Sequence, residues 1–218
     1  MPQVIAVAQA KGGCGKTTIT VCLAGYWAVQ GEQVCVIDAD PQQHSTKWIQ
    51  SGDGPLKSIG LITLPRDLPR VMAEANGDRV LVDLIGADAD VLTLAVANAD
   101  LVLIPVQDSP LDIDGALTTY RRMKQAERAR GSPIAYRIVL TRTQPQTSLY
   151  AAILRQLKEA GLAVAGAELR NRVGYKEGMM TGATPSIAWM REYAKERMEK
   201  GKNDEGEEQS GGRVLGAE

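Results

Sequence analysis

Residues 11–18 read Lys-Gly-Gly-Cys-Gly-Lys-Thr-Thr, and this stretch decides the fold. The run before it, Val4–Ala8, is short and apolar, as expected of a buried parallel strand. Gly12, Gly13 and Gly15 permit backbone angles and close approaches that a Cβ would block. The N–H groups of such a loop, together with the start of a helix behind it, can wrap a polyphosphate. The stretch therefore predicts a phosphate-binding loop between a strand and a helix.

The side chains of this loop predict nucleotide binding. Lys16 is expected to reach the β- and γ-phosphates, and the Thr17 hydroxyl is expected to ligate Mg²⁺. A Gly-rich turn that binds nothing is the alternative, but eight consecutive residues satisfy a demanding pattern. The loop residues expected to hold ATP or ADP are Lys11, Gly12, Gly13, Cys14, Gly15, Lys16, Thr17 and Thr18.

The entrance of the loop departs from the general pattern G-x-x-x-x-G-K-[ST], because Gln9 or Ala10 stands where its first glycine would fall. The form present, K-G-G-x-G-K-[ST]-[ST], is the deviant Walker-A motif, and here the chain resembles the ParA/MinD superfamily of dimerising ATPases. The resemblance implies that Lys11 crosses the interface of an ATP-bound homodimer and contacts the phosphates of the other subunit. A cation there would stabilise charge that develops in the transition state. A solvated loop lysine is the plainer alternative.

A second motif follows the strand-like run Gln33–Ile37, where residues 38–42 read Asp-Ala-Asp-Pro-Gln. This is the D-x-D-P-Q segment of the same superfamily. Carboxylates at the carboxyl end of a parallel strand lie where open α/β sheets bind their ligands. By resemblance, Asp40 orients or activates the attacking water, and Asp38 helps to organise Mg²⁺ and Lys11. An Asp-Pro pair is also compatible with simple turn chemistry.

A third acidic residue ends the apolar run Arg79–Leu84. This arrangement fits a Walker-B aspartate, so Asp83 is expected to hold Mg²⁺ through water. Most family members continue with a Pro-rich turn, whereas residues 84–87 here read Leu-Ile-Gly-Ala. The expected metal-binding residues are Thr17, Asp38 and Asp83. The expected catalytic residues are Lys11, Lys16 and Asp40.

Two later segments extend the resemblance. The I-P-V-x-x-S-P-L-D run within 104–112 is most similar to the small ParF-type plasmid partition ATPases, in which this segment lies near the nucleotide and the dimer interface. Pro110 and Asp112 can also simply open the next helix. The resemblance places Arg142 and the segment 170–185 near the adenine, although arginines there are equally compatible with surface charge.

The alternation of strand-like and helical runs predicts an α/β fold of the P-loop NTPase type, a doubly wound, mostly parallel sheet with helices on both faces. We expect one ATPase domain over residues 1–200 of the 218, followed by a polar, disordered tail over 201–218. Further strands are expected over 59–64, 101–106 and 136–141. Helices are expected over 17–30, 45–49, 68–75, 89–97, 113–129 and 149–160.

Charge and composition constrain the partners. The formal net charge is −1, so the whole chain is not a basic nucleic-acid module. The cations Arg121, Arg122, Lys124, Arg128 and Arg130 nevertheless gather on one expected helix, where a solvated face is the plainer reading. No signal-peptide pattern or membrane-length apolar run is visible, so we expect a cytoplasmic protein that does not bind membranes. The three scattered cysteines fit a reducing compartment and no zinc spacing.

The resemblance implies a slow, partner-stimulated ATPase. It would cycle between a monomer and a sandwich dimer that binds non-specific DNA, associates with the nucleoid, and partitions plasmid or chromosome copies. A small ParB-type centromere-binding protein is the implied partner. A MinD-like ATPase that positions a protein complex or organelle shares every nucleotide motif. A metabolic P-loop enzyme such as a kinase would not need Lys11.

Overall fold

The computed structural model describes residues 2–52, 56–61, 65–86 and 88–182. The strands are β1 (Gln3–Val7), β2 (Val34–Ala39), β3 (Lys57–Leu61), β4 (Arg79–Leu84), β5 (Leu101–Val106), β6 (Ala135–Thr143) and β7 (Leu169–Arg170). The helices are α1 (Lys16–Val29), α2 (His44–Gln50), α3 (Leu68–Glu74), α4 (Ala89–Ala97), α5 (Pro110–Arg130), α6 (Ser148–Glu159) and α7 (Val173–Thr181), with a short 3₁₀ turn η1 (Pro65–Asp67) before α3. The end of the expected ATPase domain and the expected tail lie outside the described residues.

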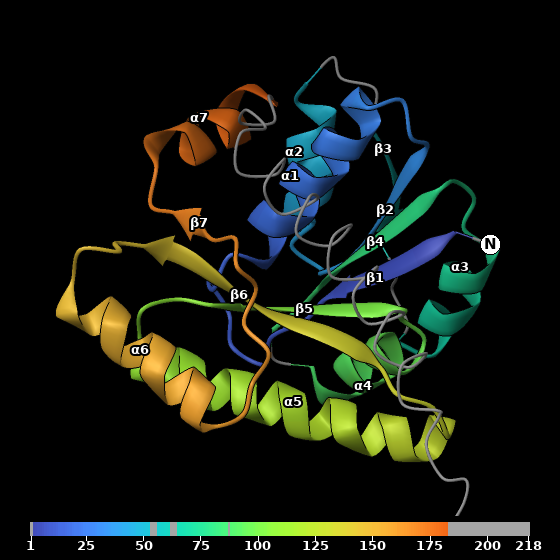
Figure 1. The fold of residues 1–218 in the computed structure, drawn as a ribbon. Coiled ribbons are helices and arrows are strands. Elements are labelled where there is room, and N and C mark those ends of the chain that lie inside the picture. Colours follow the sequence, from blue (N-terminus) through green and yellow to red (C-terminus); the bar gives the residue numbers. More distant parts are fainter. Residues whose placement is uncertain (1, 53–55, 62–64, 87, 183–218) are drawn as a thin grey trace, which may run out of the picture.

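The strands form one sheet in the order β3-β2-β4-β1-β5-β6-β7. Every strand pair in it is parallel. Helices α1, α2 and α7 lie over one face of the sheet, and α4, α5 and α6 lie over the other (Figure 1). The order of strands around β1 leaves the ends of β1, β2 and β4 side by side, which is where open α/β sheets bind ligands. The predicted doubly wound fold is confirmed.

Two hydrophobic cores, one on each face of the sheet, follow from the alternation of side chains along the strands. Ile5 and Val7 of β1 pack with Ile19 of α1 and Trp48 of α2. The intervening Ala6 and the following Ala8 face the other way. They pack with side chains of α3 to α6, which include Leu68, Leu92, Met123 and Ile153. Because the central strands are covered on both faces, they read as continuous apolar runs in the sequence.

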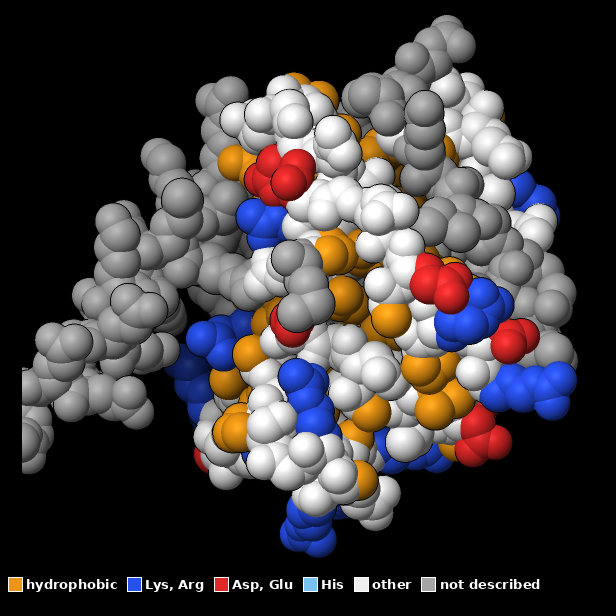
Figure 2. Space-filling view, turned by 90° about the vertical axis from the view of Figure 1, so that its right-hand side faces the viewer, with side chains coloured by type: hydrophobic (Ala, Val, Ile, Leu, Met, Phe, Trp, Pro, Cys, Tyr) orange, Lys and Arg blue, Asp and Glu red, His pale blue; other side chains and the backbone are white. Residues whose placement is uncertain are grey.

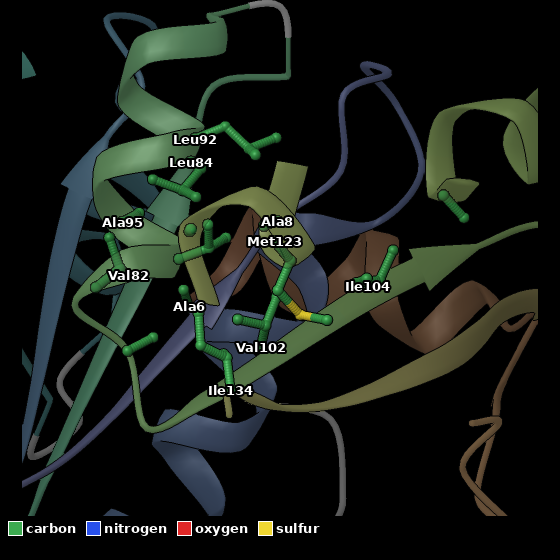
Figure 3. Close-up of a cluster of buried hydrophobic side chains, with 14 of the residues drawn as sticks. Ala6, Ala8, Val82, Leu84, Leu92, Ala95, Val102, Ile104, Met123 and Ile134 are labelled. Carbon is green, nitrogen blue, oxygen red and sulfur yellow. The ribbon is translucent and has the colours of Figure 1, made fainter. Parts of the chain in front are cut away.

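Met123 of α5 lies at the centre of the second core, among the small side chains of β1 and β5 (Figure 3). Its side chain is fully buried. We expect Met123→Ala to lower the free energy of unfolding by about 2–5 kcal/mol, through lost transfer energy and a residual cavity. Denaturant titration measures this, and Met180→Ala is the control, since Met180 is 83% exposed and should change stability by no more than about 0.5 kcal/mol. Equal effects of the two substitutions would contradict this packing.

The expected elements are present among the described residues, with boundaries shifted by at most three residues, while β7 and α7 were not anticipated. Helix α5 begins three residues early, at Pro110, which occupies the first turn where its missing N–H carries no cost. Strand β7 has two residues, too few for a periodic pattern. Helix α7 contains Gly174 and Gly178, which are poor helix formers, so its sequence carries a weak signal.

The described surface carries mixed charge on the side that includes α3 and the N-terminal end of the chain. Figure 2 shows acidic and basic side chains next to one another on this side, with no patch of one sign. The Arg70–Glu74 pair of α3 is an example, at 2.8 Å. Within the described residues, no helix is long and apolar enough to cross a membrane. The three cysteines are buried and unpaired.

Candidate functional site

The loop between β1 and α1 has the backbone shape that its glycines predict. Gly13 and Gly15 adopt φ angles of 77° and 99°, which side-chain-bearing residues rarely tolerate. The ammonium of Lys16 is buried inside the loop and donates to the carbonyl oxygen of Lys11 at 3.0 Å. From outside, the Thr141 hydroxyl donates to the Cys14 carbonyl oxygen at 2.7 Å. Strand β6 therefore supports the loop through a contact of its backbone at Cys14.

The loop also rests on Gly86, in the segment where the chain lacks the family's Pro-rich turn. A Cβ on Gly86 would lie 2.8 Å from the Gly12 nitrogen and 2.8 Å from the Lys11 carbonyl carbon. Both contacts are to backbone, which cannot swing aside as a side chain can. The Leu-Ile-Gly sequence at the end of β4 thus provides a surface on which the phosphate loop lies directly.

We expect Gly86→Ala to weaken nucleotide binding by about tenfold or more, because overpacking of this kind costs about 1–3 kcal/mol. Titration with a fluorescent ATP analogue measures the change. Gly161→Ala, in the turn after α6, is the control: a Cβ there meets no atom within 4 Å, and its φ of 69° adds only local strain. If Gly86→Ala binds the nucleotide as tightly as the parent chain does, the loop shifts at no cost and this expectation is wrong.

Two carboxylates meet in front of this loop. Asp38 and Asp83 are directly opposite each other on the adjacent strands β2 and β4, and Val7 of β1 is in the same register. Paired residues on neighbouring strands share a face and lie about 5 Å apart. Asp38 accepts hydrogen bonds from the backbone N–H of Asp40 at 3.1 Å and of Thr46 at 2.9 Å. These bonds fix its orientation and join β2 to the start of α2.

Asp83 is the more unusual of the two carboxylates. Burial raises its pKa from 3.8 to about 7. The hydroxyls of Thr17 and Ser45 and the charge of Lys16 partly offset this shift, and the charge of Asp38 adds to it. No hydrogen bond of ordinary geometry reaches either Asp83 oxygen from the described part of the chain. A buried carboxylate in this condition fits a cation, since hard oxygen ligands and hydroxyls are what Mg²⁺ prefers.

Lys11 lies at the mouth of the loop, with its side chain 38% exposed. Its ammonium makes an ion pair with Asp112, whose carboxylate is fully buried at the start of α5. The other Asp112 oxygen accepts from the backbone N–H of Gln107 at 3.0 Å. In the single chain the side-chain partner of Lys11 is thus Asp112, and the role of Asp38 in organising Lys11 stays a prediction. The pair was hard to foresee because Asp112 comes 101 residues after Lys11.

Asp40 follows β2 in a turn that leaves it partly exposed. One of its oxygens accepts from the backbone N–H of Gln42 at 2.8 Å, and Gln43 adopts a left-handed φ of 53°. The turn thus presents the carboxylate near the carboxyl end of β2. This is compatible with the predicted water-orienting role, which remains a prediction.

A cleft of about 180 Å³ opens beside the loop. Its wall includes Gly15 and Thr18 from the loop and helix α1, and Tyr175 from α7. Arg142 lines it with a left-handed φ of 52°, a conformation that costs energy in a residue with a Cβ and often marks functional sites. The cleft residues that carry a positive charge are Arg142, Arg170, Arg172 and Lys176. The predicted phosphate and base residues are thus adjacent in space.

Several residues of the site escaped the sequence analysis, namely Gln9, Ser45, Gly86, Gln107 and Thr119. Gln107 bridges to the loop through its amide, which donates to the Gly13 carbonyl oxygen at 2.8 Å. A polar Gln9 at the end of an apolar strand was the available signal, since polar side chains there are buried only with partners. The others carry no pattern that distinguishes them from ordinary loop residues. Cys14, a predicted loop residue, lies inside the loop, where its thiol donates to the carbonyl oxygen of Lys11 at 3.4 Å and burial raises the pKa of that thiol to about 11.

The fold and this loop define a P-loop protein that binds a nucleotide at the carboxyl edge of a parallel sheet. Residues 5–185 match the family described as the CobQ/CobB/MinD/ParA nucleotide binding domain. The chain belongs to this family, and the resemblance seen in its motifs is confirmed.

Individual relatives extend over most of the chain. Protein ParA of Rhizobium radiobacter is 30% identical over 177 residues, covering 79% of this chain and 80% of its own length. Maintenance of carboxysome distribution protein A of Gloeobacter kilaueensis is 32% identical over 199 residues, covering 89% and 88%. A solved structure described as a plasmid partition protein from Borrelia burgdorferi, bound to AMPPNP, has a TM-score of 0.70 at 15% identity, covering 89% and 96%. That structure supports the fold alone.

Proposed function

We propose that this protein is an ATPase that dimerises on ATP and uses the cycle to partition DNA. The observation that carries the proposal is the position of Lys11. The interior of the phosphate loop already holds the ammonium of Lys16, so a second lysine is not needed to complete the chain's own loop. Lys11 instead stands at the mouth, 38% exposed, where a second subunit can approach.

In this proposal ATP lies with its phosphates in the loop and its nucleoside in the cleft lined by Arg142 and Tyr175. Lys16 exchanges its bond to the Lys11 carbonyl for the β- and γ-phosphates. Thr17, Asp38 and Asp83 are the residues that would hold Mg²⁺. When bound, the ion would neutralise charge on the β- and γ-phosphate oxygens.

Hydrolysis requires a water held in line with the γ-phosphorus. Asp40 accepts a hydrogen bond from that water and orients it. The water oxygen bonds to phosphorus as the bond to the β–γ bridging oxygen breaks, and a proton of the water passes to a phosphate oxygen, which yields ADP and inorganic phosphate. Lys11 of the partner subunit stabilises the charge that spreads over the phosphate oxygens. Loss of the γ-phosphate removes this contact, so the dimer returns to monomers.

The DNA-partition role is supported by the ParA relative and by the charge of α5. On its exposed surface this helix carries Arg121, Arg128 and Arg130, whereas the side in Figure 2 is mixed in charge. Two copies of such a helix in a dimer would hold DNA through phosphate contacts, which are independent of sequence and sensitive to salt. A small centromere-binding protein would stimulate turnover.

A second function is favoured by a specific observation. The relative with the longer alignment is a carboxysome distribution protein, at 32% identity over 199 residues. An ATPase that positions a protein complex would use the same nucleotide cycle on a different cargo.

Analytical sedimentation distinguishes these functions. The Asp40→Ala chain, which should bind ATP without hydrolysing it, is examined with ADP and with ATP, each with and without non-specific duplex DNA. Lys16→Ala is the control that should bind neither nucleotide. A dimer that forms only with ATP and sediments with DNA supports partition. An ATP dimer that ignores DNA supports the positioning of a protein complex, and no ATP-dependent dimer overturns the proposed cycle.

A further inference from the structure

Gln9 is a buried polar side chain that joins the phosphate loop to helix α5. It lies two residues after the end of β1 and two residues before Lys11, and it is completely inaccessible to solvent. Neither the nucleotide chemistry nor the motif requires a glutamine here. A fully buried amide is stable only when its donors and acceptors are paired, so its partners indicate what it does.

The amide donates twice to the segment that opens α5. Its Nε2 atom lies 3.1 Å from the carbonyl oxygen of Pro105 and 3.1 Å from that of Asp112. Because both acceptors are carbonyl oxygens, the amide can have only this orientation. Its Oε1 atom consequently faces the other way, 3.5 Å from the backbone nitrogen of Lys11 and 3.4 Å from the Thr119 hydroxyl.

Helix α5 is shaped to receive this side chain. A Cβ on Gly115 would lie 2.6 Å from the Gln9 Oε1 atom and 3.1 Å from its Cδ atom. Thr119, one turn further on, has a hydroxyl that accepts from the backbone N–H of Ala10 at 3.0 Å. The backbone that follows Gln9 is therefore tied to the first turns of the same helix.

These contacts surround the Lys11–Asp112 ion pair. The Gln9 amide binds the backbone of Asp112 and faces the backbone of Lys11, while the two charged side chains meet each other. Lys11 can thus exchange its side-chain partner while its backbone stays in place. A rigid base under a mobile side chain is the usual requirement for precise placement of a functional group.

We propose that Gln9 is a positioning residue for Lys11, which sets the direction in which this lysine leaves the loop toward a second subunit. This role rests on the proposed ATP-dependent dimerisation. It does not extend to the binding of nucleotide by the monomer, because Gln9 contacts neither Lys16 nor the cleft in the described residues.

The first test compares Gln9→Glu with the parent chain. Glutamate has the same size but, when ionised, cannot donate to the two carbonyl oxygens. In the Asp40→Ala background, we expect ATP-dependent dimerisation to weaken about tenfold or more, since partners in a buried network are left unpaired. In the chain with Asp40 intact, kcat should fall about tenfold with KM within about threefold, the pattern of an interaction made only in the transition state. Titration with a fluorescent ADP analogue should show affinity within the same threefold range.

Thr118→Val is the control for this test. Thr118 is the neighbour of Thr119 on α5, but its hydroxyl donates within the helix, to the carbonyl oxygen of Asp114.

The second test displaces Gln9 without changing it. In Gly115→Ala the new Cβ pushes the Gln9 amide off its partners, although alanine itself favours a helix more than glycine does. We expect the same weakening of the dimer. In a Gln9→Ala background there is no amide to displace, so adding Gly115→Ala should have no further effect. Such non-additivity is the sign of a direct coupling.

The outcomes separate this inference from the function on which it rests. If the Asp40→Ala parent forms no ATP dimer, the proposed cycle itself fails. If the parent dimerises and the Gln9→Glu and Gly115→Ala chains dimerise equally well, the positioning role is wrong. It is also wrong if the two variants lose nucleotide affinity and thermal stability in parallel with dimerisation, since that is the result of general damage to the fold.

Discussion

Lys11→Ala should reduce the rate of ATP turnover by about 10³-fold or more while leaving the binding of nucleotide by the monomer nearly unchanged. This is the range by which a cation supplied from outside the phosphate loop accelerates phosphoryl transfer. The loop interior is completed by Lys16, so removal of Lys11 leaves the chain's own phosphate contacts in place. Single-turnover hydrolysis and titration with a fluorescent ATP analogue measure the two quantities separately.

The controls for Lys11 follow from its ion pair. Lys158→Ala removes an exposed lysine of α6 and should have no effect on turnover. Lys11→Ala also leaves the buried Asp112 carboxylate without its cation, which lowers stability. The double variant Lys11→Ala, Asp112→Asn removes the unpaired buried charge, so its stability should recover while its ATP turnover stays low. Turnover close to that of the parent chain in Lys11→Ala would instead favour a metabolic P-loop enzyme.

Asp83→Asn is expected to stabilise the ligand-free protein and to abolish its response to magnesium. The pKa of Asp83 is about 7 in the folded chain against 3.8 ordinarily, so the folded state binds its proton more tightly than the unfolded state does. Stability is therefore lost as the pH rises from about 4 to about 7, and the full penalty remains above that range. Asparagine carries no charge at any of these pH values, so it avoids this penalty.

Thermal unfolding across pH tests this expectation. The melting temperature of Asp83→Asn should exceed that of the parent, and the difference should grow from pH 5 to pH 7 and then level off. Each kcal/mol removed from this penalty raises the melting temperature by about 2–4 °C in a chain of this length. With ATP, the parent should gain stability when MgCl₂ is added, whereas Asp83→Asn should gain little. Asp90→Asn, on the surface of α4, is the control. If the difference in melting temperature is constant with pH, Asp83 is charged throughout this range. If Asp83→Asn keeps its stabilisation by MgCl₂, Asp83 is not part of the metal site.

The sequence by itself determined the fold class and the nucleotide loop. The run 11–18 contains glycines, lysines and hydroxyls at consecutive positions, and local geometry alone folds them into one loop. The apolar strands that end in Asp38 and Asp83 place both carboxylates at one edge of the sheet, because parallel strands share the direction of their ends. These are consequences of residue type and periodicity over short stretches, which a sequence displays directly.

The tertiary structure alone decided how this loop is held. Gln9 reaches Asp112 over 103 positions, and Thr141 reaches Cys14 over 127. Gly86 is a glycine because another backbone lies against it, which no local pattern reveals. Contacts of this kind depend on which strands are neighbours in the folded sheet, and their energies come from burial and pairing rather than from propensity. The sequence therefore predicted the phosphate loop and its residues, while only the fold showed that α5 holds the loop from which Lys11 extends.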